Sequence, residues 1–180
     1  MPRWNYILSK RVLILDTSVL CCWLQVPGKE EAGPINDRWD YARINTLLDL
    51  EKQKDSTFVL PIATLIETGN HIAQASSQRF ATASNLASCL REAAEAKSPW
   101  AAFTEQSALW QSEKLRTLAD TWPALAAGGT SIGDHTIKDV AEYYALAGYH
   151  VEILTGDAGL KAYEPTKPVS IPRRRRGTPL

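Results

Sequence analysis

The amino-acid sequence predicts an α/β protein with three layers, α/β/α, around a central parallel sheet. Short apolar runs that resemble buried strands alternate along the chain with longer stretches of helical period. Strands that alternate with helices require crossover connections, and these produce a parallel sheet with helices on both faces.

Three apolar runs are the expected strands. Residues 12–15 form a continuous apolar run, which is typical of a central parallel strand covered on both faces. Residues 57–60 and residues 151–154 have a similar character. Residues 168–171 are flanked by prolines, which suits a short edge strand.

Four amphipathic stretches are the expected helices. The pair Asn36-Asp37 should cap the first, Pro61 should begin the second, and the third covers residues 103–122. The fourth should end at Gly148. Its apolar residues recur at spacings of three and four: Ile137, Val140, Ala141 and Tyr144.

The chain length fits one domain, which we assign to residues 1–171, with a helical insertion at about 71–130. The formal net charge is zero, so composition alone does not indicate a nucleic-acid binder. Six of the 20 lysines and arginines, however, lie from Lys161 onward against the single acid Glu164. We therefore expect a net-acidic body and a basic, disordered tail at residues 172–180.

Three cysteines, Cys21, Cys22 and Cys89, are odd in number and show no CxxC spacing. This pattern favours buried free thiols in a reducing compartment over a disulfide framework or a thiolate zinc site. No apolar run approaches the roughly 18 residues of a membrane span. We therefore expect a cytoplasmic protein without a membrane segment.

Four acidic residues that are distant in sequence are expected at one edge of the sheet. Asp16 closes the first strand, and Asp157 follows a later strand in Thr-Gly-Asp. Asp134 lies one turn before Ile137 on the inward stripe, and Glu67 lies early in the helix after the second strand. Ligands of open parallel sheets bind beyond the carboxyl ends of the strands, where these four side chains would meet.

Carboxylates gathered at a few ångströms repel one another and take up protons unless cations hold them. Mg²⁺ or Mn²⁺ is the expected metal ion, because a hard cation prefers oxygen ligands. Such an ion generates a hydroxide-like water and stabilises charge on a phosphoryl group. The pattern therefore predicts a metal-dependent nuclease.

Each acid also has a purely structural interpretation. Asp16 could cap a following turn, and Asp157 could be a turn residue. Asp134 could pair with Ser131 in a helix-start motif, and Glu67 could belong to a solvated helix face. The combination of the four contexts favours the metal site.

The same stretches resemble the PIN domain, the fold of many toxin-type ribonucleases. The resemblance spans roughly residues 11–161 and rests on four segments in the family's order: residues 12–18, 61–67, 133–137 and 154–160. It implies that the four acids are catalytic and ligate metal directly or through water. It also implies that the Ser18 and Thr155 hydroxyls orient carboxylates or a bound water.

For function, the resemblance implies hydrolysis of RNA phosphodiester bonds by water, in a toxin–antitoxin or defence system. It further implies a homodimer and a small antitoxin or other regulatory partner. This chain departs from the compact toxins by a loop at residues 25–36 and by its helical region between His71 and Trp122.

Other polar residues are weaker candidates for the site. Asn70 and His71 share the helix face of Glu67, where they could bind phosphate, orient the site or form a polar surface. Asp139 is five residues from Asp134, about 140° around a helix, so we leave it out of the metal set. The run of arginines at 173–176 could steer RNA or be solvated.

Three rival functions remain. A phosphatase of the haloacid-dehalogenase type also has a strand-end Asp, but its Asp-x-Asp pattern is broken here by Ser18. A flap-endonuclease-like DNA nuclease shares the acid cluster. A PIN-like module that binds nucleic acid without cutting it would keep the fold, although an unused acid cluster costs stability.

Overall fold

Three parallel strands make the central sheet of the protein. The computed structural model describes residues 10–165. Strand β1 (Arg11–Leu15) lies between β4 (Thr57–Val59) and β5 (His150–Leu154), and both pairings are parallel. The expected central strand and its two neighbours are confirmed. The expected edge strand at 168–171 and the basic tail at 172–180 lie outside the described residues.

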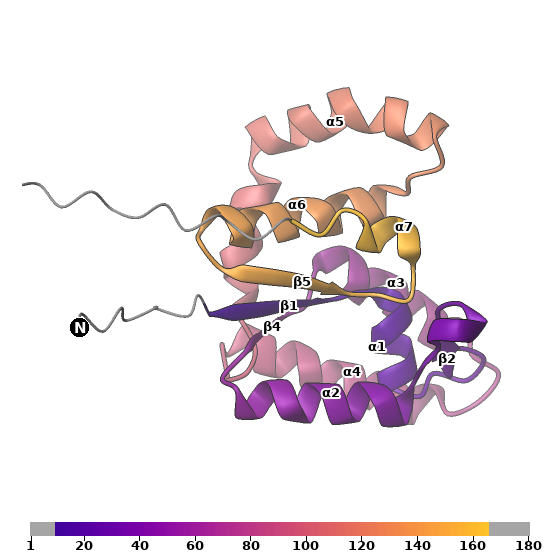
Figure 1. The fold of residues 1–180 in the computed structure, drawn as a ribbon. Helices are drawn as coiled ribbons and strands as arrows, with labels where there is room; N and C mark the ends of the chain where they lie inside the picture. Colours follow the sequence, from indigo (N-terminus) through magenta and orange to yellow (C-terminus); the bar gives the residue numbers. More distant parts are fainter. Residues whose placement is uncertain (1–9, 166–180) are drawn as a thin grey trace, which may run out of the picture.

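Helices cover both faces of this sheet, so the expected three-layer α/β/α arrangement is present (Figure 1). Along β1, Leu13 and Leu15 enter one hydrophobic core, and Val12 and Ile14 enter the other. Successive strand side chains point to opposite faces, so a fully apolar strand serves two cores at once.

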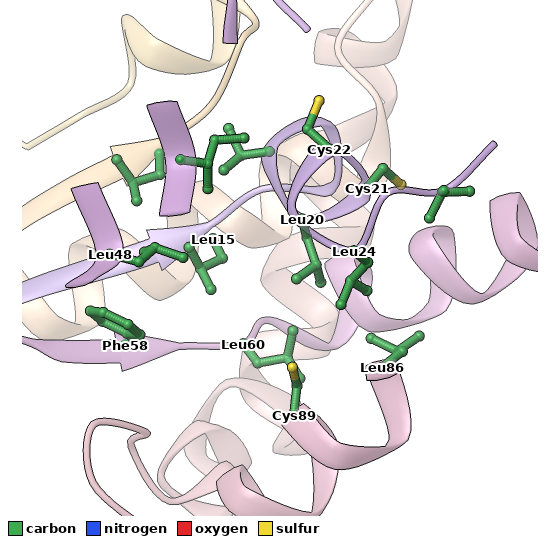
Figure 2. Packing of buried hydrophobic residues seen from close by; sticks show 14 of the residues in the cluster. Leu15, Leu20, Cys21, Cys22, Leu24, Leu48, Phe58, Leu60, Leu86 and Cys89 are labelled. Atoms are coloured by element: carbon green, nitrogen blue, oxygen red, sulfur yellow. The ribbon is translucent and has the colours of Figure 1, made fainter. Parts of the chain in front are cut away.

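The first core lies between the sheet and the helices α1 (Thr17–Trp23), α2 (Tyr41–Gln53) and α4 (Arg79–Ala94) (Figure 1). Figure 2 shows how side chains from these elements converge: Leu15, Leu20, Leu24, Leu48, Phe58, Leu60, Leu86 and Cys89. Phe58 also packs edge-on against Trp100, with ring centroids 5.9 Å apart.

The second core lies under α6 (Ile132–Leu146), which covers the opposite face of the sheet (Figure 1). The expected apolar stripe of this helix is confirmed, because all four residues are buried: Ile137, Val140, Ala141 and Tyr144. The chain then turns at Gly148, whose φ of +92° suits glycine, and returns into β5.

Helix boundaries depart from expectation in two places. Asp40, not the pair Asn36-Asp37, caps α2, because its carboxylate accepts a 2.8 Å bond from the Arg43 amide. The earlier pair lies in or beside a short 3₁₀ helix, η1 (Ile35–Asp37). The helix α3 (Ile62–Gln74) begins directly after Pro61, as expected.

The expected helix at 103–122 is instead two elements. A 3₁₀ helix, η2 (Phe103–Trp110), precedes α5 (Ser112–Ala127), and α5 continues to the Gly128-Gly129 pair. No residue of α5 is buried, and Figure 1 shows this helix as the outermost layer beyond α6. The expected helical insertion at 71–130 thus holds α4, η2 and α5 in addition to the end of α3.

A small antiparallel pair lies beside α1, where the sequence suggested only a loop. Strand β2 (Glu31–Ala32) pairs with β3 (Trp39–Asp40). Near it, Cys21 and Cys22 are buried and unbridged, as is Cys89, which confirms the expected free thiols. Among residues 10–165, no helix has the length and apolarity to cross a membrane.

Candidate active site

Asp16 leaves β1 at its carboxyl end and is held by two hydroxyl side chains. Its Oδ2 accepts bonds of 2.6 Å from Ser18 Oγ and 2.8 Å from Thr155 Oγ1. The Ser18 amide adds a longer bond of 3.3 Å, so the same carboxylate caps α1. All these bonds end on Oδ2, and the side chain is only 6% exposed. Asp16 is therefore both a helix cap and a rigidly oriented carboxylate.

The segment that follows β5 is attached to the same network. Gly156 N donates to Ser18 Oγ at 3.0 Å, and Asp157 N donates to Thr155 Oγ1 at 2.9 Å. Asp157 Oδ1 accepts from the amides of Gly159 and Leu160 and caps the short helix α7 (Ala158–Lys161). The carboxyl ends of β1 and β5 are thereby tied together by polar side chains.

Glu67 approaches the same end of the sheet from α3. The start of α3 is anchored on β1, because Thr64 Oγ1 donates a 2.8 Å bond to the Leu15 carbonyl. Glu67 Oε2 accepts a 2.9 Å bond from Thr17 Oγ1. Its other oxygen, Oε1, lies where a Cβ on Gly133 would stand. A side chain at position 133 would therefore displace this carboxylate from its place against α6.

Asp134 enters the site from the first turn of α6. Ser131 caps this helix, because its hydroxyl accepts a 2.9 Å bond from the Asp134 amide. The expected capping interaction is thus made by the backbone of Asp134 and leaves its carboxylate available. A carboxylate in the first turn is also favoured by the helix dipole.

All four acids line one pocket of about 490 Å³. Asp16 is buried, Glu67 and Asp134 are half-buried, and Asp157 is exposed at the rim. The structure therefore brings together the four residues that the sequence singled out, with Ser18 and His71 in the same lining. Thr155 reaches the site through its bond to Asp16. The exposed Asn70 is absent from this lining within the described part of the chain.

Spacing between the acids is wider than direct ligation by three of them would require. Among residues 10–165, no three His, Cys, Asp or Glu side chains approach closely enough to hold one metal ion together. The four acids nevertheless line one open pocket. That geometry suits an ion that keeps part of its water shell.

Negative charge dominates the pocket lining and affects the buried Cys21 thiol. Burial raises the pKa of the Cys21 thiol to about 11, and the charges of Asp16 and Glu67 add to the increase. Cys21 lines the pocket, yet such a thiol stays protonated near neutral pH and is a poor nucleophile. The chemistry available here therefore belongs to the carboxylates.

Sequence reasoning missed several residues of the pocket, among them Thr17, Lys29 and Glu31. Thr17 bonds to Glu67, and its position between Asp16 and Ser18 was the signal that could have identified it. Lys29 and Glu31 come from the segment between α1 and β3, and no local sequence pattern in that segment predicts its contact with the site. That contact depends on how the loop folds back over the end of β5.

A larger cavity of about 630 Å³ lies between α5, η2 and α6. His135 and Asp139 line it, with His135 Nε2 4.0 Å from Asp139 Oδ2, and burial raises the pKa of Asp139. Lys114 and Lys138 lie in the same lining, so positive and negative charges are mixed there. Size alone does not make it the reactive site, because it holds none of the strand-end acids.

Comparison with protein-family models, with curated proteins and with solved structures gives no match to this chain.

Proposed function

We propose that this protein is a divalent-metal-dependent nuclease that hydrolyses phosphodiester bonds of RNA. One observation carries the proposal: Asp16, Glu67, Asp134 and Asp157 come from four separate segments and line a single pocket at the carboxyl ends of the strands. Carboxylates that share one pocket repel one another, and a bound cation would offset that repulsion.

The donor set fits Mg²⁺ or Mn²⁺. Every candidate ligand is a carboxylate oxygen, and hard cations prefer oxygen. Mg²⁺ commonly keeps several waters and binds through one or two carboxylates, so the four acids would hold it partly through water. The bound ion would supply an acidified water and offset charge on the phosphoryl group.

The protein's own residues prepare the site. Ser18 and Thr155 fix the orientation of Asp16, and Thr17 fixes that of Glu67. Because these bonds engage Asp16 Oδ2 and Glu67 Oε2, the second oxygen of each carboxylate remains for the ion or for water. His71 also lines the pocket, and within this proposal it contacts a substrate phosphate.

RNA is the substrate we favour because the four segments resemble those of PIN-domain ribonucleases. Within the same proposal the fold is PIN-like, and the protein acts in the cytoplasm as a homodimer controlled by a small antitoxin or another regulatory protein. The arginines at 173–176, which lie outside the described residues, would add electrostatic attraction for RNA.

The decisive experiment compares labelled single-stranded RNA, duplex RNA, single-stranded DNA and duplex DNA, each with Mn²⁺, Mg²⁺ or EDTA. We expect cleavage of single-stranded RNA that stops with EDTA and with Asp134→Asn. Asp139→Asn is the matched control, because Asp139 lies on the same helix and lines the other cavity.

Other outcomes select the rival functions. Cleavage restricted to DNA would identify a DNA nuclease of the flap-endonuclease kind. RNA binding without cleavage under any metal condition would identify a binding module and end the enzymatic proposal.

A further inference from the structure

The segment between α1 and β3, called here the α1–β3 loop, brings a positive charge to the acidic pocket. Lys29, Glu31, Ala32 and Gly33 all line the pocket together with the four acids. Lys29 is the one lysine or arginine in that lining among the described residues. The pocket lining thus holds one lysine among five acids.

The loop begins with a rigid turn. Lys29 N donates a 2.9 Å bond to the Val26 carbonyl, which closes a four-residue turn. Pro27 and Gly28 occupy its central positions, and Gly28 has a φ of +84°, as the third residue of a type II turn requires. Val26 is fully buried, and its amide bonds to the Cys21 carbonyl at 3.0 Å. Lys29 is therefore presented from a turn fastened to α1.

The far end of the loop is pressed against the segment after β5. A Cβ on Gly156 would stand 2.6 Å from Gly33 N and 2.9 Å from Ala32 Cβ. Such close approach needs glycine at position 156. The loop is thus fixed at one end to the helix that follows Asp16 and at the other to the residue before Asp157.

The neighbouring acids of the loop, Glu30 and Glu31, already have hydrogen-bond or ion-pair partners, whereas Lys29 has no ion-pair partner in the described part of the chain. Glu31 pairs with Arg38 at 2.6 Å, and Glu30 accepts a bond from the Gly28 amide. No ion pair within residues 10–165 includes Lys29. Its charge is nevertheless felt inside the pocket, where it lowers the pKa of the Cys21 thiol against the stronger effect of burial.

A nuclease built on acids must still attract a polyanion. Lys29 is exposed and its long side chain ends in a compact, hydrated point charge, the kind of group that commonly contacts phosphate. A position beside the carboxylates would let it bind a phosphate next to the one that the metal holds. Without it, the pocket offers nucleic acid almost only negative charge.

We propose that Lys29 is a substrate-binding residue that contacts a phosphate group of the nucleic acid at the acidic pocket. This proposal rests on the nuclease function proposed above and adds the residue that draws the polyanion to the site. Lys29→Met should lower kcat/KM by about 10- to 100-fold, the value of one charged hydrogen bond. Lys29→Arg keeps the charge and should retain most of the activity.

The test measures RNA affinity separately from cleavage. Single-stranded RNA is titrated with Ca²⁺ in place of Mn²⁺, with the RNA checked for integrity, at several salt concentrations. Each lost phosphate contact should reduce the slope of log affinity against log salt by about 0.7. We expect that reduction for Lys29→Met, no reduction for Lys29→Arg, and none for the exposed control Lys97→Met.

A second readout concerns the metal. Removing a cation beside the acids should leave Mn²⁺ affinity equal or higher, whereas damage to the site would lower it. A Lys29→Met slope equal to that of the wild type, or reduced Mn²⁺ affinity, would overturn the proposal. If the wild type binds RNA but cuts nothing, the nuclease function is wrong. The salt dependence of RNA affinity in Lys29→Met still decides whether Lys29 contacts phosphate.

Discussion

Thr155 Oγ1 donates a 2.8 Å hydrogen bond to Asp16 Oδ2 across 139 positions of sequence. Thr155 Oγ1 also accepts a 2.9 Å hydrogen bond from the Asp157 amide. One hydroxyl thus couples the acid after β1 to the acid after β5. Because Thr155 is only 6% exposed, water cannot readily replace either bond.

Thr155→Val tests this coupling. The change keeps the branched shape but leaves the Asp157 amide without its partner and removes one of the three hydrogen bonds to Asp16 Oδ2. We therefore expect a loss of about 1–3 kcal/mol in the free energy of unfolding. Cleavage should fall as well, because Asp16 is then oriented by Ser18 alone. Urea denaturation and RNA cleavage measure the two effects. Thr121→Val, which removes an exposed helix-surface hydroxyl, should change neither.

Gly133→Ala tests the contact between Glu67 and the start of α6. Alanine normally favours a helix over glycine by up to about 1 kcal/mol. Here the new methyl group would overlap Glu67 Oε1, so the carboxylate must move. We expect no gain in stability and weaker Mn²⁺ binding, measured by calorimetry and thermal melts.

Gly69→Ala is the matched control for that substitution. Gly69 lies within α3, and a Cβ there meets no atom within 4 Å. This variant should be more stable than the wild type and bind Mn²⁺ equally well. Equal behaviour of the two alanine variants would show that the Glu67 contact does not constrain the site.

The acids were predictable from sequence because each lies at a strand end or helix start that its neighbours define. Asp16 follows four apolar residues, and Asp134 precedes a regular apolar stripe. Lys29 was not predictable, since its contact with the site arises from the packing of Gly33 on Gly156. That packing joins two loops far apart in sequence, and neither has a periodic pattern.

Local signals also compete. The cap of α2 was predicted at the pair Asn36-Asp37, but Asp40 caps the helix, and Asp is an equally good cap residue at that position. Asp40 prevails because Trp39 and Asp40 pair with β2, which places the helix start directly afterwards. Similarly, residues 103–122 have a helical period, but Gln111 is extended and divides them into η2 and α5.

Glu51 provides a prediction about acid stability. Although burial opposes its charge, hydrogen bonds from Ser56 and Lys54 and the charge of Arg11 lower its pKa below the ordinary 4.5. A lowered pKa in the folded protein stabilises the fold above pH 4.5, and this stabilisation is lost as pH falls through the lowered value.

Glu51→Gln should therefore destabilise the protein near pH 7 and weaken its dependence on pH below about 4.5. Urea denaturation between pH 3 and pH 7 measures both effects. Asp49→Asn, at an exposed position of the same helix, should leave the pH profile unchanged. Parallel profiles for Glu51→Gln and the wild type would show that Glu51 does not contribute to acid sensitivity.

Asp134→Asn separates a metal site from a structural role. Within residues 10–165 the Asp134 carboxylate makes no hydrogen bond, and only its amide bonds to Ser131. Replacing it removes one negative charge from the pocket without removing the helix cap. We therefore expect this variant to melt at or above the wild-type temperature without metal, because repulsion among the acids falls.

With Mn²⁺ added, the wild type should melt at a higher temperature than Asp134→Asn. A ligand stabilises a fold only as far as it binds the native state, so the weaker site of Asp134→Asn gains less from Mn²⁺ than the wild type does. Cleavage should fall by several orders of magnitude. Asp139→Asn should respond to Mn²⁺ like the wild type, because that residue lines the other cavity. If Asp134→Asn is destabilised without metal, equally responsive to Mn²⁺ and still active, the four acids do not form the metal site.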